Sequence, residues 1–186
     1  MISMKTDGIF EVVPGSLYSV RFAGESKHEL RKVFELWNDW AYLESFFDEH
    51  YADLLAFWEN TSVEEAVTAT IDEAHKLEKA LLRIAHLGRD GGFENLSTLF
   101  KPLQRYTCGL EKLERSKARG FRMHSWLRIY AIRLSVNHFV ITGGAIKLTR
   151  TMNERAHLEE ELRKLDAVRE FLKVDQKDEF GLFELF

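Results

Sequence analysis

One segment, from Ser62 to Gly88, restricts the fold of this chain more than any other. Ser62 and Glu65 have the spacing of a capping box, in which each side chain accepts a hydrogen bond from the other residue's backbone N–H. The core-facing residues that follow recur at steps of four and three, and so form one stripe: Val63, Val67, Thr70, Ala74, Leu77, Leu81 and Ile84. Gly88 and the Gly91-Gly92 pair predict the end of this helix. Because a helix with one apolar stripe is stabilised mainly by packing, the chain must supply a second layer.

Segments with β-type patterns supply that layer. Leu17–Phe22 has β-type alternation after a Pro14-Gly15 turn, and Ile9–Val13 is either its extension or its partner. Three further strands are predicted at residues 126–134, 138–142 and 145–148, with a bulge or sharp bend at Gly143-Gly144. The sequence therefore predicts an α+β fold. Its small, antiparallel-rich sheet contains an N-terminal strand and a three-strand meander, with helices packed on one face and a C-terminal helix.

Other helices are expected on both sides of the long one. Ser26 with Glu29, and Thr151 with Glu154, repeat the capping-box spacing, and each precedes an amphipathic stretch. Residues 40–60 are aromatic and acidic, and their spacing favours one or two helices over a loop. The segment 105–124 is expected to be a basic, irregular connector, and residues 174–186 a mobile tail.

Length and composition indicate one globular domain, residues 1–186. At 45% hydrophobic the chain can bury a core, yet no apolar run approaches the ~20 residues that span a bilayer. Residues 1–8 lack an apolar signal-peptide core, and Cys108 is the single cysteine, which excludes an intrachain disulfide. The scattered histidines lack the spacing of a metal site. We therefore expect a cytoplasmic protein with no membrane partner, no metal and no cofactor.

Charge is strongly segregated along the chain. Residues 33–75 contain 11 acidic residues and no Lys or Arg, whereas residues 101–150 contain 11 basic residues opposed only by Glu111 and Glu114. This separation permits a local positive field that attracts phosphates, even though the net charge is −4. It is equally compatible with two halves that face and neutralise each other.

Four segments, in order, resemble one protein family. They are Lys101-Pro102-Leu103, the basic Leu113–Arg119, Trp126–Tyr130 (WLRIY) and Phe139–Thr149 (FVITGGAIKLT). This order is similar to the central part of RelE/HigB-like toxins, of the phage-derived RelE/ParE superfamily. Those proteins run from a K-P-L element into a strand with an R-[IV]-x-[YF] core and end in a Lys-rich pattern. Leu148 replaces the second Lys of that pattern, and residues 40–60 look like a helical insertion in a RelE-like domain.

The resemblance implies the toxin component of a toxin–antitoxin system, an endoribonuclease that cleaves mRNA on the ribosome without a metal and is silenced by a cognate antitoxin. Such cleavage requires an activated 2′-hydroxyl, a stabilised phosphorane and a protonated 5′-oxygen. By position, the implied catalytic residues are Arg128, Lys147 and Tyr130, and the implied RNA-binding residues are Lys117, Arg119 and Arg122.

Each of these residues also has an ordinary structural interpretation. Arg128 is compatible with a cross-strand ion pair and Tyr130 with a core position. Lys147 is compatible with an edge-strand lysine that discourages aggregation, and residues 117–122 with a solvated loop. Two other functions stay open: a toxin of the same fold that inhibits DNA gyrase by binding, and a non-catalytic protein-interaction module that uses the acidic helices.

Overall fold

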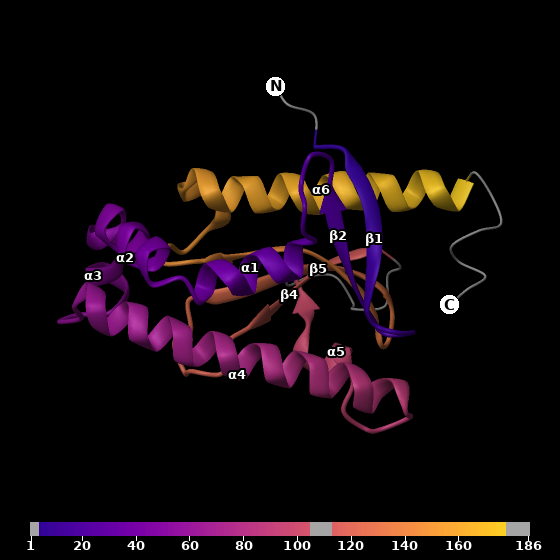
Figure 1. Ribbon diagram of the computed structural model, residues 1–186, viewed down its shortest axis with the longest axis horizontal. Coiled ribbons are helices and arrows are strands. Elements are labelled where there is room, and N and C mark those ends of the chain that lie inside the picture. The colour runs from indigo at the N-terminus through magenta and orange to yellow at the C-terminus, as the bar shows by residue number, and fades with distance from the viewer. Residues whose placement is uncertain (1–3, 105–112, 178–186) are drawn as a thin grey trace.

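A computed structural model of the chain describes residues 4–104 and 113–177 and confirms the α+β class (Figure 1). The strands are β1 (Thr6–Val13), β2 (Leu17–Phe22), β3 (Lys101–Pro102), β4 (Glu114–Arg119), β5 (Leu127–Ser135) and β6 (His138–Ile146). The helices are α1 (Glu29–Trp37), α2 (Trp40–Glu49), α3 (Tyr51–Phe57), α4 (Val63–Arg89), α5 (Leu96–Leu99), the 3₁₀ turn η1 (Met152–Glu154) and α6 (Ala156–Lys177). Cys108 and residues 178–186 of the predicted tail lie outside the described residues, and α6 continues past residue 174.

The described strands form one mixed sheet in the order β1-β2-β6-β5-β4-β3. β2 runs parallel to β6, and all other neighbours are antiparallel. The predicted meander is present, but its members differ from the prediction. Its first strand is β4, in the segment expected to be irregular. The two short strands predicted at 138–142 and 145–148 are one strand, β6, because its register shift opposite Tyr130 and Ala131 bends the strand without ending it.

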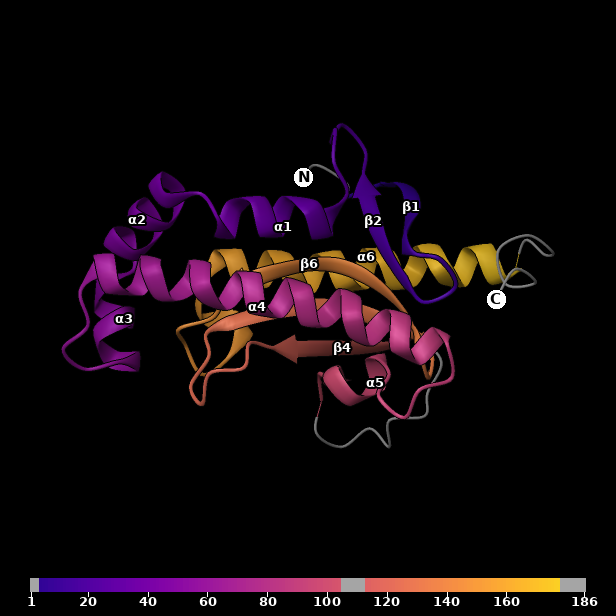
Figure 2. The same ribbon diagram turned by 60° about the horizontal axis from the view of Figure 1, so that its bottom comes forward.

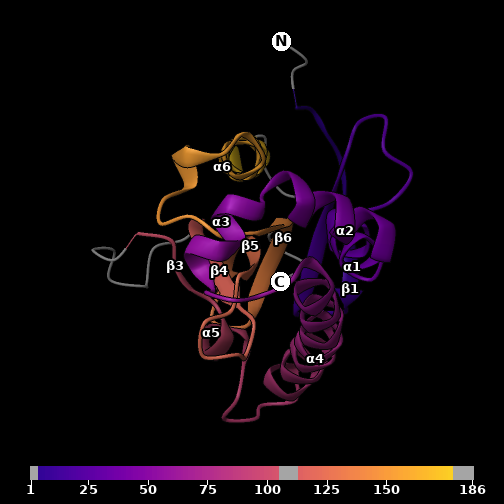
Figure 3. The same cartoon turned by 90° about the vertical axis from the view of Figure 1, so that its left-hand side faces the viewer.

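Helices cover both faces of this sheet. Figure 3 shows α6 on one face and α1 and α4 on the other, so helices α1 to α5 share a face and the C-terminal helix packs alone. On the α4 face, α1 and α4 lie side by side along the sheet (Figure 2). We call the two sides the α4 face and the α6 face.

The α4 face is packed by aromatic side chains at one end. Trp126 is 2% exposed and meets the rings of Phe47, Phe57 and Trp58 at centroid distances of 5.5, 5.8 and 5.2 Å. Its indole Nε1–H donates to Thr70 Oγ1 on α4 at 3.0 Å. The aromatic residues of the predicted insertion, which forms α2 and α3, therefore complete the core at this end.

Two of the three predicted capping boxes are confirmed. Ser62 and Glu65 cap α4, and Thr151 and Glu154 cap η1, one residue before α6. The box at Ser26 was wrong, because His28 is the N-cap of α1. Gly88 does not end α4, which continues to Arg89; a Cβ at this glycine would overlap the side chain of Asn137. A glycine is therefore required at position 88 because α4 packs closely against the β5–β6 turn there.

Candidate functional site

Strand pairing brings together the cations that were predicted from separate segments. Lys117 lies opposite Tyr130, and Arg119 lies opposite Arg128. Directly paired residues of a sheet share a face, and Tyr130 packs with α6 residues, so these side chains belong to the α6 face. Lys147 follows the end of β6, where its backbone N–H donates to Trp126 O at 2.7 Å. We call Lys117, Arg119, Arg128 and Lys147 the basic cluster.

Arg128 is the deepest member of the basic cluster, with 8% of its surface exposed. Its Nη1 donates to the carbonyl oxygens of Ser125 and Leu127 at 2.8 and 2.7 Å. Burial, followed by the positive charge of Arg119, lowers the pKa of Arg128 to about 10. The predicted catalytic arginine thus supports the backbone that leads into β5 and adds positive charge below the surface.

Lys147 is half-buried, and its Nζ donates to the carbonyl oxygens of Thr149 and Arg150 at 2.5 and 2.6 Å. Burial lowers the pKa of Lys147, as do the nearby charges of Arg128, Lys117 and Arg119, while Glu154 acts in the opposite direction. After burial, repulsion from the other cations of the basic cluster is thus a second cause of the lowered pKa of Lys147. A bound anion would relieve that repulsion.

Tyr130 is fully buried, between the basic cluster and the interior of the α6 face. Its hydroxyl donates to Met152 Sδ at 2.9 Å. Burial, followed by the charge of Glu161, raises the pKa of Tyr130 above its ordinary value. Since Met152 and the surrounding core enclose the hydroxyl, a role in proton transfer would require η1 to move.

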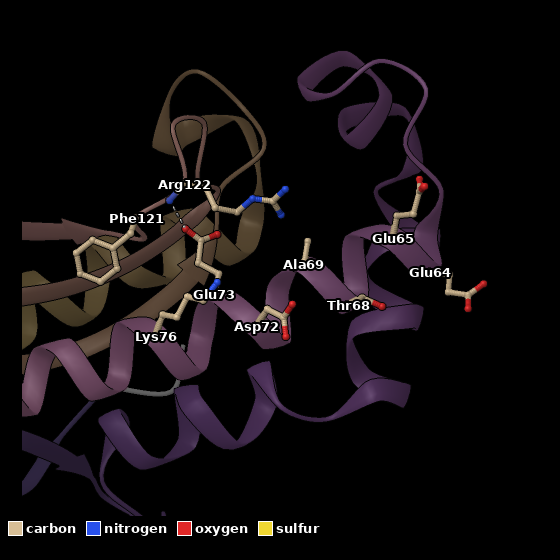
Figure 4. A pocket seen from close by; sticks show the side chains of 9 residues that line it. All are labelled: Glu64, Glu65, Thr68, Ala69, Asp72, Glu73, Lys76, Phe121 and Arg122. Carbon is tan, nitrogen blue, oxygen red and sulfur yellow. Dashed lines mark hydrogen bonds between the residues drawn. The ribbon is translucent and has the colours of Figure 1, made fainter.

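Arg122 is not part of the basic cluster. Its guanidinium lies over the ring of Trp58, 4.4 Å from the centroid, and its backbone N–H donates to Glu73 Oε1 at 3.0 Å. It lines a groove of about 640 Å³ between α4 and the β4–β5 loop (Figure 4). The α4 wall of this groove is largely acidic, with Glu64, Glu65 and Asp72. The predicted RNA-binding residues are therefore divided between two surfaces.

Segregated charge is only partly neutralised across the fold. Asp53, from the acidic segment, accepts from Arg155 Nε and Nη2 at 2.7 and 2.6 Å. By contrast, Arg119, Arg128 and Lys147 form no ion pair with a carboxylate among the described residues. These three members of the basic cluster therefore keep a positive charge that no carboxylate neutralises in the part of the chain that the structure describes.

A second group of charges, which the sequence reasoning missed, lies between α6 and α1, beside the end of β6. Lys164 Nζ donates to Glu29 Oε2 and Glu161 Oε1, both at 2.8 Å, and Glu161 Oε2 is buried without a hydrogen-bond partner. Burial, opposed by Lys164, raises the pKa of Glu161 to about 7. A signal was present in the sequence, because Glu161 stands three residues after Leu158 and four before Leu165 on an otherwise apolar helix face.

Residues 4–104 and 113–177 contain no group of His, Cys, Asp and Glu side chains arranged to hold a metal ion. No helix in the same residues is long and apolar enough to cross a membrane. Comparisons with protein-family models, with curated proteins and with solved structures find no match to this chain.

Proposed function

We propose that the protein binds RNA through the basic cluster and acts as an mRNA-cleaving toxin of the RelE/HigB kind, controlled by an antitoxin protein. One observation carries the proposal: strand pairing brings four cations to one end of the sheet, where burial and the neighbouring positive charges lower the pKa values of Arg128 and Lys147. Like charges that repel in the free protein are stabilised by a polyanion, and phosphate contacts dominate the affinity of proteins for nucleic acids.

Each member of the basic cluster has a role that its position suits. Arg119 is exposed and Lys117 half-buried, so both can contact phosphate oxygens from solvent. Arg128, which is buried beneath them, adds to the positive electrostatic potential at this surface. Lys147, whose pKa is lowered, is the member best suited to exchange a proton with the 2′-hydroxyl or the leaving oxygen, because its neutral form is more accessible than that of an ordinary lysine. The resemblance in residues 101–149 supports the choice of mRNA on the ribosome as substrate.

The test is regulated expression in a bacterial host, with growth and transcript integrity followed together. Growth arrest with fragmented mRNA is expected, and Lys147→Ala and Arg119→Ala should each relieve it while leaving the protein folded. Lys76→Ala is the matched control, because Lys76 is an exposed lysine on the α4 face and its loss should leave the arrest unchanged.

Two results would overturn the proposal. Arrest with intact transcripts and a DNA-damage response would indicate inhibition of gyrase instead. Normal growth, together with no RNA binding by the purified chain, would favour a non-catalytic interaction module that uses the acidic helices.

A further inference from the structure

The groove between α4 and the β4–β5 loop (residues 120–126), which we call the α4 groove, has the opposite charge to the basic cluster. Four of its nine lining residues are carboxylates, against two cations, Lys76 and Arg122. Glu64 and Asp72 are exposed and form no ion pair with any residue that the structure describes. The groove therefore has an excess of negative charge, on the other face of the sheet from the basic cluster.

The β4–β5 loop, which forms the second wall of the α4 groove, is held in a defined position. Glu73 is 3% exposed on α4, and its Oε1 accepts from the backbone N–H of Arg122 at 3.0 Å. A Cβ at Gly120 would overlap this oxygen and Ser125 Oγ, so the close approach of helix and loop requires a glycine. Within the loop, the backbone N–H of Ser125 donates to Arg122 O at 3.1 Å. A wall that is ordered before a partner binds lowers the entropic cost of binding.

Glu73 also leaves one oxygen available to the α4 groove, which it lines. Only Oε1 accepts a hydrogen bond from the described part of the chain, and Oε2 accepts none there. A carboxylate at this depth is costly unless its oxygens are hydrogen-bonded. The N–H groups of a cation are its strongest partners. The groove is thus suited to a cationic donor.

The same loop adds apolar surface beside these carboxylates. Phe121 lines the groove and is 55% exposed, and Met123, two residues further on, is 92% exposed. Figure 4 shows the Phe121 ring and the Arg122 side chain extending from the loop in different directions. Large apolar side chains that a fixed loop exposes indicate an interaction surface. A partner for this surface needs apolar as well as positively charged groups.

The length of the α4 groove favours a peptide over a small molecule. Its lining residues on α4 run from Glu64 to Lys76, which corresponds to roughly 18 Å of helix. An extended segment of about five or six residues has the same length. Such a segment can place basic and apolar side chains along the whole groove, whereas a small cation would contact only one part of it.

We propose that the α4 groove binds a basic, extended segment of a partner protein, whose Lys or Arg side chains pair with Asp72 and Glu73 and whose apolar side chains pack on Phe121. Complementary charge selects a cationic partner over a nucleic acid here. The apolar contact distinguishes this partner from a simple polyamine. The inference goes beyond RNA binding and does not depend on it, because the groove and the basic cluster lie on different faces.

The experiment is a titration of the full chain with a short fluorescent peptide of alternating arginine and leucine, at several salt concentrations. Saturable binding that weakens as salt rises is expected. Peptides with glutamine in place of arginine, or alanine in place of leucine, should bind on the order of 10-fold more weakly. Phe121→Ala should lower the affinity by about 10-fold, as for an interface anchor. Asp72→Asn should lower it by about 3-fold, as for an exposed ion pair.

Asp48→Asn and Phe93→Ala are the matched controls, because both residues are exposed and neither lines the α4 groove. Equal losses for Asp72→Asn and Asp48→Asn would reveal only a general attraction of the peptide to an acidic protein, and would overturn the site. Equal affinity for the glutamine peptide would overturn the cationic occupant. Self-association abolished by Asp72→Asn, without peptide binding, would overturn the proposal in favour of a second copy of the chain.

RNA binding by Asp72→Asn and Phe121→Ala, measured in parallel, separates this inference from the proposed function. Both variants should bind RNA as the wild type does, because neither residue belongs to the basic cluster. Peptide binding by a chain that binds no RNA would support the α4 groove and overturn the proposed function. RNA binding by a chain that binds no peptide would overturn this inference alone.

Discussion

The two faces of the sheet are built from different kinds of side chain. At the end that carries the candidate site, the α4 face is filled by Trp126 and the aromatic residues of α2 and α3. Apart from the buried Glu73, its acidic residues there lie outside, on the wall of α4. The α6 face has charges within its layer: Arg128 lies under the basic cluster, and buried Glu161 pairs with Lys164, which also reaches Glu29 on α1.

This difference separates the residues that stabilise the fold from those suited to binding and catalysis. Apolar aromatic packing stabilises the fold without needing a partner charge. Buried charges must be paired, and they rarely improve stability over apolar residues of the same shape. Groups with perturbed pKa values gather at functional sites, and four such groups on or against the sheet, Arg128, Tyr130, Lys147 and Glu161, belong to the α6 face. We infer that the α4 face is the scaffold and the α6 face the working side. Three predictions test this division, from the largest effect to the smallest.

The largest effect is expected on the scaffold. Trp126→Ala removes a buried indole from three ring contacts and leaves Thr70 Oγ1 without its donor. Removing a buried aromatic side chain of this size lowers the free energy of unfolding by about 3–5 kcal/mol. Denaturant unfolding followed by circular dichroism would measure it.

The control is Trp40→Ala, because Trp40 is 44% exposed at the start of α2. Its free energy of unfolding should stay within about 0.5 kcal/mol of the wild type. Comparable losses for the two variants would mean that the aromatic cluster around Trp126 is not the principal support of this end.

A smaller effect, with a distinctive pH dependence, is expected inside the α6 face. The folded-state pKa of Glu161 is raised from 4.5 to about 7, so the folded protein retains a proton that the unfolded chain releases. The stability that this proton contributes is complete below pH 4.5 and is lost as the pH rises through 7. Glu161→Gln, which is neutral throughout, should remove a loss of about 1–3 kcal/mol between pH 5 and 8.

Glu159→Gln is the comparison, because Glu159 is exposed on the same helix. Chemical denaturation at pH 5, 6, 7 and 8 should give the Glu159 variant the wild-type profile. A Glu161→Gln profile parallel to the wild type would show that Glu161 is ionised in the folded protein. The α6 face would then resemble an ordinary ion-paired interior.

How far the sequence predicts this structure depends on whether the signal is local. The capping box at Ser62, the helices of residues 40–60 and the strand Leu17–Phe22 were predictable because caps and periodicity act within a few residues. The box at Ser26 failed because two side chains with the correct spacing do not exclude a neighbouring cap, here His28.

Features that depend on pairing between distant segments were not predictable. β4 reads as a basic loop because its alternation of Ser116 and Ala118 with Arg115 and Lys117 becomes meaningful only beside β5. The same holds for the candidate site. The family resemblance indicated Lys117, Arg119, Arg128 and Lys147, yet only the register brings them together, and it leaves Arg122 on the groove side. Burial, which encloses Tyr130, likewise follows from the position of η1.

The smallest expected effect concerns Tyr130. It decides whether this buried residue only stabilises the position of η1 or also takes part in proton transfer. In a double-mutant cycle, Tyr130→Phe and Met152→Leu each remove one side of the hydroxyl–thioether hydrogen bond. A coupling energy of about 0.5–1.5 kcal/mol in unfolding experiments is expected for such a bond. If the hydroxyl only supports η1, the two variants should affect transcript cleavage equally. If Tyr130 takes part in proton transfer, Tyr130→Phe should abolish cleavage, whereas Met152→Leu, which frees the hydroxyl, should retain it. The second outcome would extend the working side of the sheet from the surface cations into the core of the α6 face.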